Sequence, residues 1–182
     1  MSGFEFIFSL FGLLLGLALA EGLGGLSRAI KASHRIRIGY PTALLGLFVS
    51  CDVVTFWMYG WSLKDLLPLT WPVLFGGFVV TATYYVSASL IFPDDLEAWS
   101  DLDAHFDRHG RKVLAGVFLC NVALLATTLA LVGWHPITLR TAIVTWSFFP
   151  VTALAIAVRN RKVAMACLAW LIALYPISVL WT

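Results

Sequence analysis

Six long apolar stretches, separated by shorter polar segments, dominate the hydropathy pattern of this chain. A bilayer core about 30 Å thick needs about 20 apolar residues in helical form. Only helices and closed barrels satisfy every backbone group in lipid, and these runs are too long for barrel strands. The pattern therefore predicts one all-α, polytopic integral membrane domain over residues 1–182. Its six transmembrane helices are expected at about residues 5–27, 41–61, 71–92, 113–133, 138–158 and 163–181.

The longest polar interruption, residues 93–112, lies between the third and fourth predicted spans and contains six of the ten acidic residues. Asp94 or Asp95 could cap a helix at its start, and Gly110 could end it. Apolar residues recur at helical spacing between these signals. We therefore expect a short amphipathic helix at about residues 94–109, lying on the membrane surface. Its apolar face would consist of Leu96, Trp99, Leu102 and Phe106.

The composition agrees with a membrane protein. The chain is 60% hydrophobic and 12% charged, with a mean hydropathy of +0.90, whereas soluble domains carry about 25% charged residues. A soluble domain of this size could not bury so much apolar surface. The three cysteines, Cys51, Cys120 and Cys167, lie inside apolar runs without metal-binding spacing, so we interpret them as core residues.

The basic residues are segregated into alternate connections, which predicts an orientation. Cytoplasmic connections of membrane proteins carry an excess of lysine and arginine. Ten of the twelve basic residues fall in the first, third and fifth connections, leaving only Lys64 and Arg140 elsewhere. The bias predicts that both termini lie outside the cytoplasm, and the pattern as a whole resembles a small bacterial inner-membrane protein. The ten residues are Arg28, Lys31, Arg35, Arg37, Arg108, Arg111, Lys112, Arg159, Arg161 and Lys162.

Small residues spaced by four follow one face of the first predicted span, at Gly12, Gly16, Ala20 and Gly24. Such a stripe lets another helix backbone approach closely. We expect a close helix contact there, either within the chain or between subunits of a homo-oligomer.

Asp52, near the middle of the second predicted span, is the main candidate for function. An aspartate at a helix centre costs about 2.5–3.5 kcal/mol on insertion scales. Its carboxyl group must therefore be protonated, hydrogen-bonded or in contact with water, and such a residue is by default a functional hypothesis. It could instead simply join helices. The polar groups expected near its depth are Thr81, Tyr84 and Tyr85 of the third span and Ser147 of the fifth.

Other polar residues are weaker candidates. Glu21 and Asn121 lie within predicted spans, and Glu21 could simply pair with Arg28. Asp101, His105 and His109 are spaced by four and share a helix face, so they could ligate zinc or form part of a solvated acidic surface. Beyond these three residues the sequence predicts no metal site, and it predicts no cofactor. All four histidines lie outside the predicted spans, which argues against haem.

Three functions remain open. The first is a channel or transporter for an ion, proton or small solute that uses Asp52. The second is a membrane scaffold or accessory subunit, and the third, for which no motif is present, is a lipid-modifying enzyme. The expected partners are membrane lipids and further copies of the chain, and no long basic segment suggests nucleic acid. A polar cavity at Asp52 would favour transport, and a dry packed bundle would favour the scaffold.

Overall fold

The computed structural model describes residues 3–36, 38–96, 99, 101–134 and 136–181, with side chains from Phe8 onward. These ranges form helices and connections without a strand. Six helical segments are long and apolar enough to cross a membrane, so the predicted all-α, multi-pass architecture is confirmed at this level. The elements are α1 (Gly3–Lys31), α2 (Tyr40–Ser62), α3 (Trp71–Ser89), α4 (Leu102–Val132), α5 (Leu139–Thr141), the π-helix η1 (Ala142–Trp146), α6 (Phe148–Ala157) and α7 (Arg161–Leu180).

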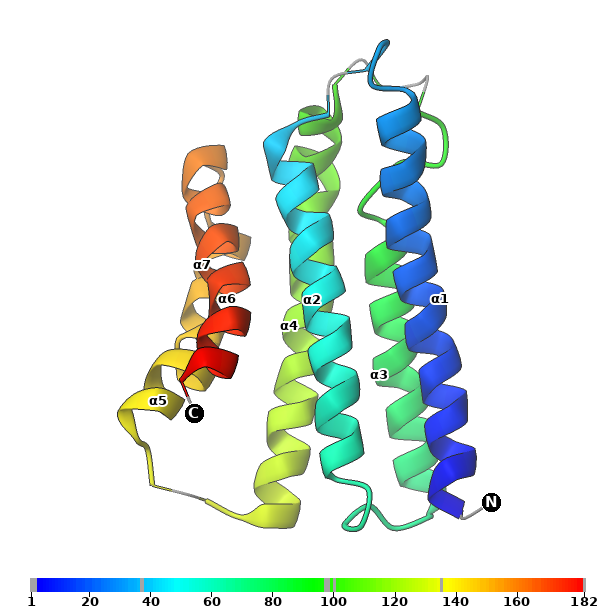
Figure 1. The fold of residues 1–182 in the computed structure, drawn as a ribbon, viewed down its shortest axis with the longest axis vertical. Helices are drawn as coiled ribbons and strands as arrows, with labels where there is room; N and C mark the ends of the chain where they lie inside the picture. The colour runs from blue at the N-terminus through cyan, green and yellow to red at the C-terminus, as the bar shows by residue number, and fades with distance from the viewer. Residues whose placement is uncertain (1–2, 37, 97–98, 100, 135, 182) are drawn as a thin grey trace.

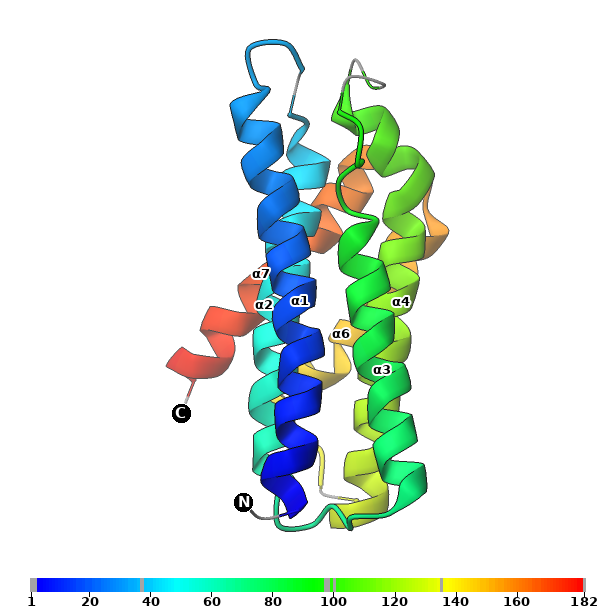
Figure 2. The ribbon, with the colours of Figure 1, turned by 90° about the vertical axis from the view of Figure 1, so that its right-hand side faces the viewer.

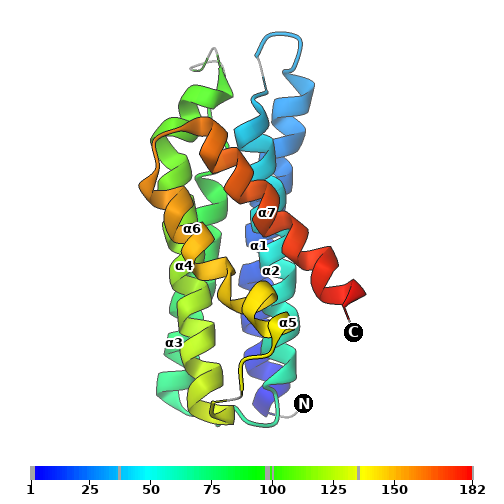
Figure 3. The same ribbon diagram turned by 90° about the vertical axis from the view of Figure 1, so that its left-hand side faces the viewer.

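Helices α1 to α4 run side by side along the long axis of the molecule (Figure 1). The pair α6 and α7 packs against the side formed by α2 and α4, and α7 is tilted relative to the other four (Figures 2 and 3). The connections from α1 to α2 and from α3 to α4 lie at one end of the bundle. The N-terminus and the connection from α2 to α3 lie at the other end.

The bundle buries one face of each helix and leaves large apolar side chains on its outside. Phe48 and Val53 of α2 and Leu171 of α7 are fully buried. Leu13 and Leu119, in contrast, are 61% and 62% exposed on the outer surfaces of α1 and α4. A soluble protein rarely exposes so much apolar surface, whereas a lipid environment requires it. The fold is therefore compatible with a membrane protein.

The prediction of a separate surface helix at residues 94–109 is wrong. Helix α4 begins at Leu102, after Asp101 caps it by accepting a 2.9 Å hydrogen bond from the Asp103 N–H, and continues to Val132 without interruption. Residues 97, 98 and 100 of the predicted helix lie outside the described part of the chain.

Gly110 does not end this helix, because a single interior glycine costs only about 1 kcal/mol in helix propensity. Instead, Gly110 is buried within α4. The apolar residues Leu102 and Phe106 are also buried in the bundle. The first turns of α4 are therefore part of the packed protein, not a helix resting on the lipid surface.

The fifth span is divided at Ser147, shortly before a proline. Pro150 falls in the first turn of α6, where a missing N–H removes no helical hydrogen bond. Just before it, the Ser147 N–H donates to the Ala142 carbonyl at 3.0 Å, five residues back, closing the wider turn of η1. The widened turn lets the helix restart at Phe148 and keeps the span continuous in space.

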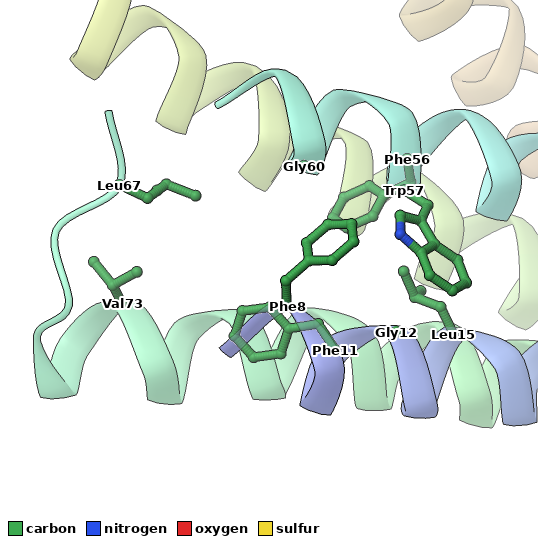
Figure 4. A pocket seen from close by; sticks show the side chains of 9 residues that line it. All are labelled: Phe8, Phe11, Gly12, Leu15, Phe56, Trp57, Gly60, Leu67 and Val73. Carbon is green, nitrogen blue, oxygen red and sulfur yellow. The ribbon is translucent and has the colours of Figure 1, made fainter. Parts of the chain in front are cut away.

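The small-residue stripe of α1 makes a close contact within the chain at Gly12 only. A Cβ atom on Gly12 would lie 3.1 Å from Trp57 of α2, whose ring lies over the start of α1 beside a small apolar cavity of about 50 Å³ (Figure 4). Gly16 has no neighbouring atom within 4 Å of such a Cβ, Gly24 meets only Arg28 of its own helix, and Ala20 is exposed. Most of the stripe therefore faces away from the other helices.

Two other glycines make the close approaches in this part of the bundle. A Cβ on Gly25 would lie 2.6 Å from the Phe92 ring, and one on Gly77 of α3 would clash with the Phe11 ring of α1. The tightest of these contacts therefore involve Gly25, which lies in α1 but outside the predicted stripe, and Gly77, which lies in α3.

Candidate functional site

Asp52 lies inside the bundle, with only 3% of its surface exposed. It follows Phe48 by one helical turn and adjoins Val53, and both of these residues are fully buried. Because residues four apart share a helix face, packing of the apolar residues of α2 also directs Asp52 inward. The carboxyl group is thus held in the interior by its apolar neighbours.

Three side chains from three other helices donate hydrogen bonds to this carboxyl group. The Tyr84 hydroxyl of α3 lies 2.7 Å from Oδ2, and the Asn121 Nδ2 of α4 lies 2.9 Å from the same oxygen. The Tyr175 hydroxyl of α7 donates to Oδ1 at 2.9 Å. Asn121 Nδ2 also lies 3.2 Å from the Tyr84 hydroxyl. The cluster of Asp52, Tyr84, Asn121 and Tyr175, called here the Asp52 cluster, therefore connects four helices.

The donors of the Asp52 cluster are all neutral. Within the described part of the chain, no lysine or arginine forms an ion pair with Asp52. A carboxylate can accept about four hydrogen bonds, and three are made here. The group therefore keeps room for one further donor or a cation.

A cavity of about 260 Å³ reaches Asp52 and is large enough for several water molecules. Thr55 and Tyr59 follow Asp52 by one and two turns of α2, and Tyr59 is 49% exposed. The cavity thus extends from Asp52 toward the end of the bundle that holds the connection from α2 to α3. Apart from Asp52, its polar lining consists of Thr55, Tyr59, Asn121, Thr128, Thr145, Tyr175 and Ser178.

The structure brings Tyr84 and Asn121 to Asp52, but it places Thr81, Tyr85 and Ser147 elsewhere. Thr81 is buried and donates to the Gly77 carbonyl of its own helix at 2.9 Å. Tyr85 is 38% exposed, because consecutive helical residues point about 100° apart and Tyr84 occupies the inward direction. The Ser147 hydroxyl donates to the Ile143 carbonyl and accepts from the Trp170 indole at 3.1 Å.

Tyr175 is the member of the Asp52 cluster that the sequence analysis missed. It lies among mostly apolar residues of α7, immediately before Pro176. A buried tyrosine hydroxyl usually requires a hydrogen-bond partner. The one tyrosine of the sixth span could therefore have been recognised as a candidate for a polar contact inside the bundle. Nothing in the local sequence indicated which helix would supply that partner.

The four remaining acidic and histidine candidates have local partners. Glu21 lies 3.6 Å from Arg28, which agrees with the ion pair that the sequence analysis gave as the alternative to a functional role. Asp101 caps α4, while the rings of His105 and His109 stack with centroids 4.4 Å apart. The described residues contain no group of three side chains arranged to hold a metal ion, so this geometry does not support the zinc hypothesis.

Comparisons with protein-family models, with curated proteins and with solved structures find no match to this chain. The functional interpretation of the Asp52 cluster therefore depends on its own geometry and chemistry.

Proposed function

We propose that this protein is a small channel or transporter for a proton, a cation or a small polar solute, and that Asp52 is its binding group. The observation that carries the proposal is the cavity of about 260 Å³ that reaches a buried carboxyl group. We further propose that the chain resides in a bacterial inner membrane as a homo-oligomer surrounded by lipid, with both termini outside the cytoplasm. The distribution of basic residues supports that orientation.

The chemistry of the Asp52 cluster supports binding of a positively charged species. A buried carboxylate with neutral donors carries an uncompensated charge, which is costly in a low-dielectric interior. A proton or cation entering the cavity would neutralise it. The hydroxyls of Tyr84 and Tyr175 hold the two carboxylate oxygens in place, so the group is already oriented when the ion arrives.

Passage beyond Asp52 would require a gate. Phe48 is fully buried one turn before Asp52 in α2, and its ring lies 6.2 Å from that of Phe148, which also lines the cavity. In the proposed cycle, the ion binds Asp52 from the end of the bundle nearest Tyr59. Movement of α6 and α7 then separates Phe48 from Phe148 and opens the opposite side.

Reconstitution into liposomes tests the proposal. Wild-type protein should pass protons or a monovalent cation, measured with an internal pH or cation indicator, and Asp52→Asn should abolish the flux while the variant still folds. Asp65→Asn removes an exposed carboxyl group from the connection between α2 and α3 and should retain the wild-type rate. A wild-type protein that passes no ion or small solute would defeat the proposal.

A scaffold or accessory subunit is the competing function, and one observation favours it. Three hydrogen bonds already satisfy most of the Asp52 carboxyl group and connect α2 to α3, α4 and α7. Such a cluster could serve only to hold the helices together. In that case Asp52→Asn would reduce stability without changing any measured flux.

A further inference from the structure

We infer that a basic groove between α4 and the connection from α6 to α7 binds the phosphate group of an anionic ligand. The groove has a volume of about 540 Å³. Five of the twelve residues that line it are lysine or arginine and only one is acidic. It therefore gathers five of the twelve basic residues of the whole chain. They are Arg108, Arg111 and Lys112 of α4, with Arg159 and Arg161 from the start of α7 and the preceding connection.

Asp107, the acidic residue that lines the groove, is already paired with an arginine. Asp107 accepts hydrogen bonds from Arg161, with Nε 2.9 Å from Oδ1, and this pair connects α4 to the start of α7. Arg111, Lys112 and Arg159 form no ion pair with the described residues. Three unpaired cations around one hollow repel one another, so a bound anion would lower the energy of the folded protein.

The start of α7 adds to this preference for an anion. Asn160 lines the groove and caps α7, its side chain accepting a 2.9 Å hydrogen bond from the Lys162 N–H. The N-terminus of a 20-residue helix carries a partial positive charge and N–H groups without helical partners. Phosphate oxygens can accept from such N–H groups and from arginine side chains together.

The inner wall of the groove is apolar. Phe106 and Leu114 of α4 and Ala155 and Ala164 of α6 and α7 are buried side chains that line it. The connection from α6 to α7 lies beside the part of α4 nearest the end of the bundle that holds the connections from α1 to α2 and from α3 to α4 (Figures 1 and 3). Cations at the rim with an apolar wall beneath fit a phosphate group attached to hydrocarbon, as in an anionic phospholipid. A free phosphate compound would use the same cations without the wall.

Native mass spectrometry of the purified protein in detergent tests the groove. Phosphatidylglycerol and phosphatidylcholine are added separately, and calorimetry with inorganic phosphate forms a second arm. The Arg111→Gln/Arg159→Gln variant removes two unpaired cations of the groove. Lys31→Gln, an exposed lysine of α1, is the control for general charge, and gel filtration verifies that each variant folds.

For a lipid ligand, we expect phosphatidylglycerol to be retained over phosphatidylcholine, with its bound fraction falling at least fivefold in the double variant and unchanged in Lys31→Gln. For a free phosphate ligand, the lipids should bind alike, while inorganic phosphate binds the wild type and the Lys31→Gln control but not the double variant. The inference would be overturned if the wild type neither preferred phosphatidylglycerol over phosphatidylcholine nor bound inorganic phosphate. It would also be overturned if the double variant kept the wild-type binding, or if Lys31→Gln lost as much binding as the double variant. Because the assay measures binding, its outcome is independent of ion flux through the Asp52 cavity.

Discussion

The Tyr175 hydroxyl donates a 2.9 Å hydrogen bond to Oδ1 of Asp52, although 123 residues separate the two in sequence. This bond attaches α7, which lies at the side of the bundle, to the interior of α2. It also places a polar group of α7 in the wall of the cavity. A single contact therefore contributes both to the assembly of the helices and to the proposed ion site.

Tyr175→Phe should lower the free energy of unfolding by about 1–3 kcal/mol, because Asp52 would lose a donor while remaining buried. Thermal unfolding in detergent measures the change. Tyr85→Phe is the matched control, since the Tyr85 side chain is exposed and is not a member of the Asp52 cluster. Equal shifts in the two variants would contradict the assigned role of Tyr175.

Tyr84 and Asp52 should be energetically coupled. Tyr84 is fully buried, so Tyr84→Phe should be strongly destabilising while Asp52 keeps its carboxylate. In the Tyr84→Phe/Asp52→Asn variant the loss should be smaller than the sum of the two single losses, by about 0.5–3 kcal/mol. A double-mutant cycle on denaturation in detergent measures this coupling, and strict additivity would show that the hydrogen bond contributes nothing to stability.

Gly25→Leu should destabilise the bundle by about 1–3 kcal/mol or more, because even a Cβ atom would lie 2.6 Å from the Phe92 ring. Gly16→Leu should leave the thermal stability of the monomer nearly unchanged, because no neighbouring atom lies within 4 Å of that position. Unfolding of both variants in detergent tests the pair. Loss of stability at Gly16 equal to that at Gly25 would show that a partner covers the small-residue stripe.

The proposed orientation predicts opposite labelling at the two ends of the bundle. With the native cysteines replaced by alanine, Ser33→Cys should be inaccessible to a membrane-impermeant maleimide in intact cells and react after lysis. Thr70→Cys should react in intact cells. Both positions are exposed in connections at opposite ends of the bundle. The reverse labelling pattern would show that both termini lie in the cytoplasm, and it would leave the description of the fold unchanged.

The sequence by itself determined the six long apolar helical segments and drew attention to Asp52 as an acidic residue inside one of them. Helix formation in lipid depends on the local length of an apolar run, because every backbone group must find a partner within the segment. The cost of an aspartate inside such a run is also local, so Asp52 could be recognised without knowledge of its neighbours. Counting helical turns could place Thr81, Tyr84 and Tyr85 near the depth of Asp52, but it could not show which of these side chains point toward it.

Only the tertiary structure decided which side chains meet. A membrane helix is apolar on nearly all sides, so its sequence indicates poorly how it is rotated, and packing selects Tyr84 over Tyr85 and Gly25 over Gly16. Likewise, the start of α4 is polar in sequence, but packing of Leu102 and Phe106 makes it continuous with the span. The bond from Tyr175 to Asp52 depends on how α7 docks against α2, and no local pattern encodes that arrangement.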